Sequence, residues 1–380
     1  MGTRKCTLAQ LGEFGLIDLL ARTLGGPGFE RGPAAGRRRA HGVPGRARGK
    51  TGTPREARGG GGASPVRIGI GDDAAVLRVP AGSDLVFTTD SLFEGVHFRL
   101  DWATPEEIGW KALAASASDL AAMGARPLAC VVALGAPRGS RVERLLELYR
   151  GMRRAAKAMG LPVTGGDTSR ADCLALSVSA VGVVPRGRAV PRDGGRPRDV
   201  IYVTGSLGDS ALGLELLRRA SAKRGGVRTL RQSSDRHVQH LLRRHFRPEP
   251  RLAAAARVMG LRPTSMIDVS DGLSSELGHL ERAAGVCAHI DTDSLPLGSS
   301  LCAVSERLGL DPIHFALGGG EDYELLFTIP PAMPRRGALR SLVPGVPLNA
   351  IGYLGRASRG SSGRGDSGSS SRTAGFDHFR

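Results

Sequence analysis

Short apolar runs that lead into an aspartate recur along this chain, and they restrict the folds that it can adopt. They occur as GIGDD (Asp72, Asp73), FTTD (Asp90), TGGD (Asp167) and MIDVSDG (Asp268, Asp271). Each run has the length and the Val, Ile or Phe content of a strand. Helical patterns alternate with these runs, most clearly at residues 105–125 and 140–160. The alternation predicts an α+β or α/β architecture in which acidic residues follow strands.

The helical pattern that begins at residue 105 carries a complete start signal. Thr104 is placed to be the N-cap, Pro105 occupies the first helical position, and Glu107 completes a capping box. Asp119 lies further along the same helix, inside the Ala-rich stretch ASASDLAAMG. An acid on an apolar helix face is not a typical solvated surface charge, so we expect Asp119 to need a partner cation.

Composition divides the chain into segments of different character. Its 380 residues are enough for two domains of about 150 to 200 residues each. Residues 25–64 contain almost no large apolar side chain, which predicts a disordered basic insert. Pro, Gly and Arg dominate residues 185–199, which predicts a domain boundary there. We therefore predict an N-terminal domain at 1–190, a C-terminal α+β domain at 191–356 and a low-complexity tail at 357–380.

The formal net charge of +17 would suit a nucleic-acid partner, but it is unevenly distributed. Residues 31–62 hold nine Lys and Arg against one Glu, which is +8 of the total. Aromatic residues make up only 4%, which disfavours a base-stacking surface. We therefore expect no nucleic-acid partner, except through the basic insert.

The cysteines and the apolar runs predict the compartment. The five cysteines are scattered and form no CxxC pair, which favours a reducing compartment and disfavours a zinc site. No run reaches the ~18 apolar residues of a membrane span, and the N-terminus shows no apolar signal core. We expect a cytoplasmic protein with no membrane association.

The acidic segments offer oxygen ligands without any His or Cys ligand spacing. Hydroxyls accompany the acids at Thr88, Thr89 and Ser270, and glycines accompany them at Gly69, Gly71, Gly165 and Gly166. Oxygen-only ligand sets suit Mg2+, and glycine turns let backbone N–H groups approach phosphates. A single aspartate in a glycine turn is usually a turn former, so the prediction depends on the recurrence. The pattern predicts a metal-assisted phosphoryl-transfer site.

Seven blocks of the sequence resemble the thiamine-monophosphate kinase family. They are RIGIGDDAAVL, TTDSLFEGVHF, WKALAASASDLAAMGARP, TGGDTS, YVTGSLGDSALGLELL, IDVSDGLSSELGHL and LGGGEDYELLFT, and the match covers residues 8–24 and 66–356. The resemblance implies a two-domain α+β fold like that of aminoimidazole ribonucleotide synthetase. It also implies that the domain at 1–190 binds ATP and Mg2+ and mediates dimerisation, in a homodimer in which N-terminal strands of both chains form a central barrel. The implied reaction is direct transfer of the ATP γ-phosphoryl group to thiamine monophosphate.

The resemblance also implies roles for individual residues. The implied ligands of several Mg2+ ions are Asp73, Thr88, Thr89, Asp90, Asp119, Asp167, Asp268 and Asp271, of which Asp90, Asp119, Asp167 and Asp268 are catalytic. The implied nucleotide contacts are Tyr149, Gly166, Asp167, Arg192 and Ser270. The implied thiamine-phosphate contacts are His97, Glu321 and Phe376. Because the acceptor is already an ionised phosphate, we expect no general base.

Other interpretations remain open from the sequence alone. His97 could be a packed loop histidine, Glu321 an edge-strand charge and Arg192 a linker charge. Another ATP-using enzyme of the same superfamily is the nearest alternative. A selenophosphate synthetase would need a catalytic cysteine beside a lysine, and Cys6 follows Lys5 but precedes the first helix. An alternative from a different class is a basic RNA-associated protein whose acidic turns are purely structural.

Overall fold

The computed structural model describes residues 7–24, 64–70, 74–331 and 342–357. The insert expected to be disordered and the low-complexity tail therefore lie almost wholly outside the described residues. The same is true of two candidate site residues, Asp73 and Phe376, and of the neighbouring Asp72. Among the described residues, no helix combines the length and the hydropathy that crossing a bilayer requires.

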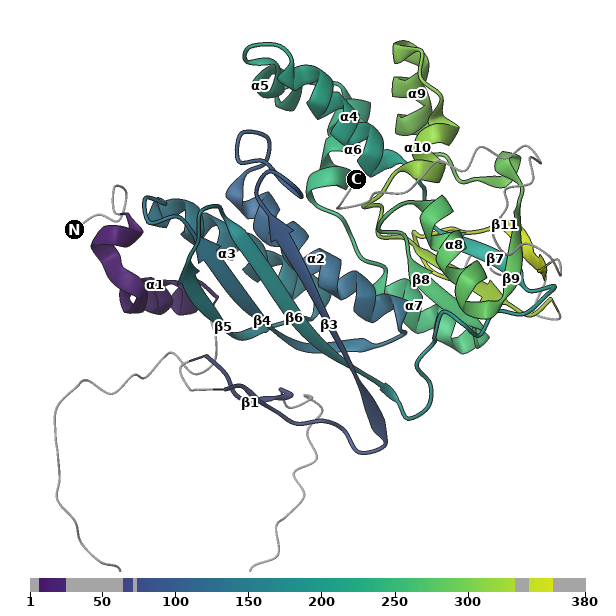
Figure 1. Cartoon of the computed structure of the whole chain (residues 1–380), viewed down its shortest axis with the longest axis horizontal. Coiled ribbons are helices and arrows are strands. Elements are labelled where there is room, and N and C mark those ends of the chain that lie inside the picture. Colours follow the sequence, from purple (N-terminus) through teal and green to yellow (C-terminus); the bar gives the residue numbers. More distant parts are fainter. Residues whose placement is uncertain (1–6, 25–63, 71–73, 332–341, 358–380) are drawn as a thin grey trace, which may run out of the picture.

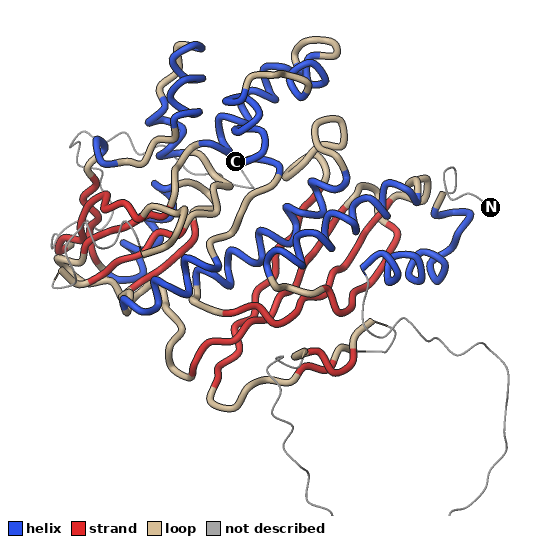
Figure 2. The backbone as a smooth tube through the Cα atoms, turned by 180° about the vertical axis from the view of Figure 1, so that it is seen from behind, coloured by secondary structure: helices blue, strands red, loops and turns tan. Residues whose placement is uncertain are grey.

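The first sheet is built from the N-terminal half of the chain. Its described strands run in the order β3 (Ser83–Phe93), β6 (Ala175–Pro185), β4 (Arg126–Ala136) and β5 (Val163–Arg170). The β4–β5 pair is parallel and the other pairs are antiparallel. Helices α2 (Pro105–Ala122) and α3 (Val142–Met159) cover one face, as the views from both sides show (Figures 1 and 2). Helix α1 (Leu8–Leu24) packs against α3 and β5.

The pleat of the first sheet separates its two faces along β3. Thr88, Asp90 and Leu92 share the face that packs on α2, and Leu92 is buried there. Phe87 and Ser91 alternate with them and are exposed on the opposite face. Successive side chains of a strand point to opposite faces, so neighbouring residues of β3 belong to different environments.

The second sheet is built from the C-terminal half and carries a core on each face. Its described strands run in the order β8 (Ser265–Asp268), β10 (Leu325–Ile329), β7 (Val200–Thr204), β11 (Leu348–Arg356) and β9 (Val286–Ile290), with antiparallel neighbours throughout. One core includes residues of α7 (Leu252–Val258) and the end of α2, and the other includes residues of α8 (Leu273–Ala284) and α10 (Pro312–Gly318). Every residue of β10 is buried, as expected for a strand covered on both faces.

The remaining elements extend the two halves. Helices α4 (Asp209–Ser221), α5 (Gly226–Arg231), α6 (Arg236–Phe246) and α9 (Ser299–Leu308) project together beyond the second sheet (Figure 1). Strands β1 (Val66–Ile68) and β2 (Val76–Leu77) form a separate small sheet, and η3 (Met259–Leu261) and η4 (Thr292–Ser294) are short 3-10 helices. The α+β class is confirmed, and the domain boundary at residue 190 stays a prediction.

Local signals predicted the helix ends correctly. Thr104 accepts a hydrogen bond from the Glu107 amide, and the Glu107 side chain accepts one from the Thr104 amide, which confirms the capping box. Gly160 ends α3 in a left-handed conformation, as glycine favours. Helices α5, α6, α9 and α10 were not predicted.

Two expected turns are strand interiors instead. The strand expected to end at Asp90 continues to Phe93, because β3 pairs with β6 over its whole length. The TGGD segment is part of β5 and pairs with β4, so the turn expected at Gly166 was wrong. A Cβ atom on Gly166 would lie 2.0 Å from the carbonyl oxygen of Val132, so only glycine allows this close pairing.

Candidate active site

Three acidic residues from separate segments converge beside helix α2. Asp90 comes from β3, Asp119 from α2 itself and Asp268 from the end of β8, and α2 packs against both strands. The Thr88 hydroxyl donates a hydrogen bond to Asp119. The Ser118 hydroxyl donates one to Asp268 at 2.6 Å. The structure therefore brings together three of the four predicted catalytic acids, which are called the acidic cluster below.

The acidic cluster has the electrostatics of carboxylates held close together away from water. Burial, and next the charge of Asp119, raises the pKa of Asp90 to about 6. Burial, and next the same charge, raises the pKa of Asp268 to about 7. Burial also raises the pKa of Asp119, although the Thr88 hydrogen bond and the charge of Arg192 oppose this shift. Each carboxylate thus makes ionisation of the others harder, and a cation would relieve the repulsion.

The acidic cluster fits a cation but does not form a complete ligand shell in the described chain. The Oδ2 atom of Asp90 is buried and has no hydrogen-bond partner, which is costly unless something binds it. No three or more His, Cys, Asp or Glu side chains of the described residues are arranged to hold a metal ion. Asp73, the remaining candidate from the first acidic segment, lies outside those residues. The donor chemistry, with carboxylate and hydroxyl oxygens only, suits Mg2+.

A second group of acids continues from the acidic cluster along the turn between β8 and α8. The amide of Asp271 donates to Glu276 Oε1 at 3.1 Å, and the Ser270 hydroxyl donates to the same atom at 3.4 Å. Burial raises the pKa of Glu276 to about 7, and the charge of Asp271 adds to this shift. The charge of Arg192 opposes it, as it does at Asp119. Arg192 therefore lies near both acidic groups. Glu276 is a member of the second group that the sequence analysis did not identify.

The loop that precedes β10 is bound onto this turn in a strained conformation. Glu321 and Tyr323 have φ angles of 64° and 52°, which side chains other than glycine rarely adopt. The Glu321 amide donates to the Ser270 carbonyl at 2.7 Å, and the Tyr323 amide donates to the Val269 carbonyl at 2.9 Å. Burial, then the charges of Glu321 and the acidic cluster, raises the pKa of Tyr323 well above its usual range. The strained loop thus places Glu321 and Tyr323 beside the acids.

Lys111 is a functional candidate that the sequence analysis missed. Its Nζ atom lies 2.6 Å from Oε1 of Glu321, although the two residues are 210 positions apart. Lys111 is on α2, the helix that carries Asp119. The Lys111 side chain is 4% exposed, whereas that of Glu321 is 27% exposed. Burial and the contact with Glu321 distinguish Lys111 from an ordinary helix lysine, and no local sequence pattern encodes that contact.

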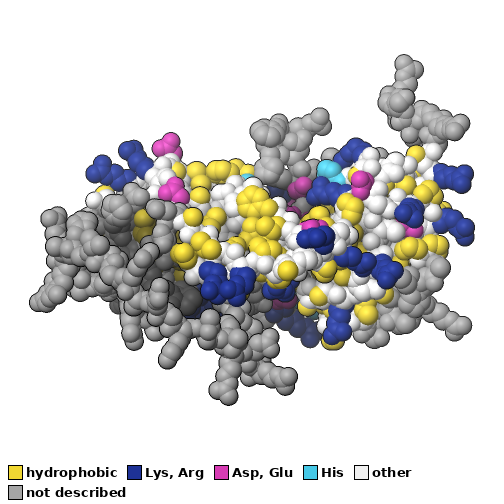
Figure 3. Space-filling model, turned by 90° about the horizontal axis from the view of Figure 1, so that it is seen from below, with side chains coloured by type: hydrophobic (Ala, Val, Ile, Leu, Met, Phe, Trp, Pro, Cys, Tyr) yellow, Lys and Arg dark blue, Asp and Glu magenta, His cyan; other side chains and the backbone are white. Residues whose placement is uncertain are grey.

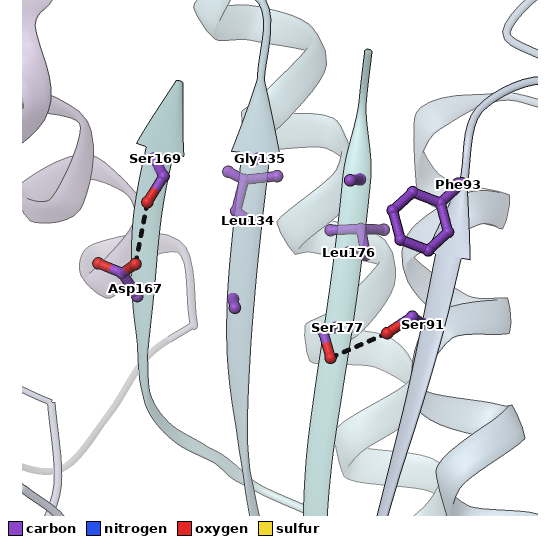
Figure 4. Close-up of a pocket in the computed structure, with 10 residues that line it drawn as sticks. Ser91, Phe93, Leu134, Gly135, Asp167, Ser169, Leu176 and Ser177 are labelled. Carbon is purple, nitrogen blue, oxygen red and sulfur yellow. Dashed lines mark hydrogen bonds between the residues drawn. The ribbon is translucent and has the colours of Figure 1, made fainter. Parts of the chain in front are cut away.

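Asp167 and Thr89 lie on the other face of the first sheet, away from the acidic cluster. Asp167 pairs with Ala133, in the same row as Ser177 and Ser91. Ser169 donates a hydrogen bond to Asp167 at 3.0 Å, and Ser91 donates one to Ser177 at 3.1 Å (Figure 4). These side chains line a cavity of about 200 Å³ that is open to solvent. Within one chain, the structure does not bring Asp167 to Asp90, because the sheet lies between them.

The other candidates are distributed between these regions. Tyr149 is buried in the core beneath the first sheet, and this burial, with Cys130 nearby, raises its pKa. Its hydroxyl is therefore not placed among the acids. Gly166 lies beside Asp167 in β5. His97 follows β3, where its Nδ1 atom accepts a hydrogen bond from the Phe93 amide at 3.0 Å.

Comparison with known proteins identifies relatives over most of the chain. Residues 71–184 match the family described as "AIR synthase related protein, N-terminal domain". The thiamine-monophosphate kinase of Salmonella typhimurium is 39% identical over 293 residues, which are 76% of this chain and 84% of that protein.

Solved structures of similar proteins give the same result. The crystal structure of thiamine-monophosphate kinase from Stenotrophomonas maltophilia K279a matches with a TM-score of 0.70 and 38% identity, over 77% of this chain and 90% of that one. AaThiL in complex with AMPPCP and TMP matches with a TM-score of 0.65 and 32% identity, over 92% of this chain and 93% of that one.

Proposed function

The chain belongs to the thiamine-monophosphate kinase family, and from this membership we propose that it transfers the γ-phosphoryl group of ATP directly to thiamine monophosphate. The products are thiamine diphosphate and ADP. The observation that carries the proposal is the convergence of Asp90, Asp119 and Asp268, from three separate segments, in a chain of this family. A relative solved with both AMPPCP and TMP supports the pairing of a nucleotide with this acceptor.

The acidic cluster is proposed to hold Mg2+ between the two substrates. Both substrates are anionic, so charge repulsion is the main barrier to their approach. Bound Mg2+ supplies positive charge that bridges carboxylate and phosphate oxygens. Thr88 and Ser118 orient the carboxylates of Asp119 and Asp268 through their hydroxyls. Arg192 adds positive charge near the same acids, and the ionised acceptor phosphate needs no general base.

The remaining contacts are proposed from the family resemblance. Ser270 and Arg192 lie near the acids and are proposed as nucleotide contacts, and Asp271 as a further Mg2+ ligand. Glu321 and His97 are proposed as contacts of thiamine monophosphate. The roles of Asp73 and Phe376 remain predictions, because both residues lie outside the described chain.

A homodimer is proposed from the face of the first sheet that no described helix covers. Four large apolar side chains are exposed on this face, namely Leu85 (57%), Phe87 (70%), Phe93 (43%) and Val131 (39%). An exposed apolar sheet face favours burial against another surface. A second copy on this face would also cover Thr89 and Asp167, which the sheet separates from the acidic cluster of their own chain.

Replacing Phe87 with aspartate is expected to convert the dimer into monomers. The new carboxylate would have to be buried without a partner in the proposed interface. Size-exclusion chromatography with light scattering measures the mass directly. Leu308→Asp is the matched control, because Leu308 is 38% exposed on α9, away from the first sheet. A wild-type protein that is monomeric at micromolar concentration, or a Phe87 variant that stays dimeric, would contradict the interface.

Phosphorylation of thiamine monophosphate by the purified protein is the direct test of the proposed function. With ATP and Mg2+, we expect thiamine diphosphate and ADP to form in equal amounts, and chromatography resolves both products. Free thiamine is the control acceptor and should not be converted. The absence of thiamine diphosphate with an intact, folded protein would refute the proposal.

The RNA-associated alternative is separated by deleting residues 28–62 from the same protein. The kinase proposal predicts retained turnover in the deletion variant, whereas an RNA-associated role predicts loss of the main activity.

On the described part of the face seen in Figure 3, Lys and Arg side chains are scattered among hydrophobic ones and form no continuous basic surface. We place the reaction in the cytoplasm, on the basis of the scattered cysteines.

A further inference from the structure

Lys111 holds Glu321 from below the strained loop that precedes β10. Its Nζ atom lies 2.6 Å from Oε1 and 2.7 Å from Oε2, so it contacts both carboxylate oxygens. His245 on α6 contacts the same group, with Nδ1 3.4 Å from Oε2. Lys111 is almost fully buried, while Glu321 keeps a quarter of its side chain exposed. The pair therefore joins a buried cation to a carboxylate whose side chain is partly exposed.

Stability alone does not explain why a lysine occupies this buried position. Removing a lysine from water is costly, and well-packed apolar residues stabilise such sites as well as an ion pair does, or better. Glu321 also has the left-handed φ of 64°, which adds strain to the loop. Backbone strain of this kind is concentrated at binding and active sites, where a fixed side-chain geometry is needed to bind a ligand.

Lys111 supplies the positive charge that opposes Glu321 from the buried side. Burial lowers the pKa of His245 well below its usual range, and the charges of Lys111 and Arg218 add to this shift. His245 is therefore neutral near pH 7 and contributes hydrogen bonding, with Ser210 Oγ also 3.2 Å from its Nδ1. Without Lys111, the Glu321 carboxylate would add its full negative charge to a site that already contains the acidic cluster. Such a site would repel the phosphate of the acceptor.

We propose that Lys111 is a positioning residue for the acceptor substrate, which fixes the Glu321 carboxylate and neutralises it so that an anionic phosphate ester can bind beside it. The proposal rests on the proposed function, since it takes thiamine monophosphate as the acceptor. Lys111 acts through Glu321 and does not need to touch ATP. Its loss should therefore weaken acceptor binding and leave nucleotide binding unchanged.

The test is a double-mutant cycle of Lys111→Met, Glu321→Gln and the double variant in the full-length protein. We expect the KM for thiamine monophosphate to rise about tenfold or more in each single variant, as for losing one hydrogen bond to a charged group. The KM for ATP should change less than about twofold, because its contacts are elsewhere. Arg154→Met is the control, because it breaks an exposed ion pair, 2.6 Å long, between Arg154 of α3 and Glu106 of α2, the helix of Lys111.

The double variant separates a positioning role from a structural one. It removes both charges together, so its melting temperature should recover toward that of the wild type even where each single variant is destabilised. If Lys111 positions the acceptor through Glu321, the double variant keeps the high KM for thiamine monophosphate. Its increase in KM is then smaller than the product of the increases in the two single variants, because both changes remove the same contact. Recovery of that KM together with stability would show a purely structural pair and overturn the proposal.

Two further outcomes distinguish this proposal from the proposed function. A wild-type protein that makes thiamine diphosphate, with a Lys111→Met variant that behaves like Arg154→Met, would refute the role of Lys111 alone. A wild-type protein that converts no thiamine monophosphate would overturn both proposals. Equal increases of the KM for ATP and for the acceptor would also contradict a role specific to the acceptor.

Discussion

Replacing Asp119 with asparagine is expected to reduce turnover by about 100-fold or more, which is typical of losing a charge that stabilises the transition state. Asp119 is at the centre of the acidic cluster, because its charge acts on both Asp90 and Asp268. Asparagine has the same shape and can still accept the Thr88 hydrogen bond, so the change removes charge with little change in packing. Steady-state rates at saturating ATP, Mg2+ and thiamine monophosphate measure the effect.

The same variant should be at least as stable as the wild type when no metal is present. Asp90 binds its proton more tightly in the folded state, because its pKa is raised from 3.8 to about 6. The folded state therefore loses stability as the pH rises from about 3.8 to about 6. Removing the charge of Asp119 reduces this loss above about pH 6. Thermal unfolding at pH 7 in EDTA should therefore show an unchanged or higher midpoint, and added Mg2+ should stabilise the variant less than the wild type.

The control for Asp119 is a second acid of helix α2. Glu106→Gln removes a charge that pairs with Arg154 near the start of the helix, and it should leave turnover close to that of the wild type. Near-normal turnover of the Asp119 variant would remove Asp119 from the proposed metal site. A large loss of stability in EDTA would show that its main role is structural.

The sequence predicted those features that depend on local chemistry. Thr104, Pro105 and Glu107 encode the start of α2 within four positions, and the structure has that capping box. The acidic segments were grouped because acids beside apolar strands and on an Ala-rich helix are costly unless they share a cation. The structure brings Asp90, Asp119 and Asp268 together beside α2, and their joint role in holding a metal stays a prediction. The family resemblance then gave the fold class, which the comparisons confirm.

Features that depend on register and on distant contacts could not be predicted. Asp90 and Asp167 both follow apolar runs, yet they lie on opposite faces of one sheet, because Asp167 pairs in the row of Ser91 rather than that of Asp90. A one-residue change of register reverses the face, and the sequence does not specify register by itself. Lys111 has no distinguishing neighbour in the sequence, since its partner is brought to it by the fold.

Glu324 is the centre of a buried ionic group just beyond the strained loop. It is fully buried and accepts a hydrogen bond from Thr204 Oγ1 at 2.6 Å. Arg244 Nη2 donates to it at 2.9 Å, and Arg251 donates through Nε and Nη2, both at 2.6 Å. The group joins α6 and the start of α7 to the second sheet at β10. It therefore anchors the chain directly after the loop that carries Glu321.

Replacing Glu324 with glutamine should destabilise the protein by about 3 kcal/mol or more, the usual cost of removing one partner from a buried ion pair. Glutamine preserves the shape but removes the charge that pairs with Arg244 and Arg251, and its amide group directs hydrogens toward them. Arg244 keeps the longer contact of its Nε atom with the buried Asp209, at 3.9 Å. Urea unfolding monitored by circular dichroism measures the change. Glu215→Gln is the control, since its pair with Arg219 is solvent-exposed and should be worth less than about 1 kcal/mol. Equal effects of the two variants would show that the buried group contributes no more to stability than a surface pair.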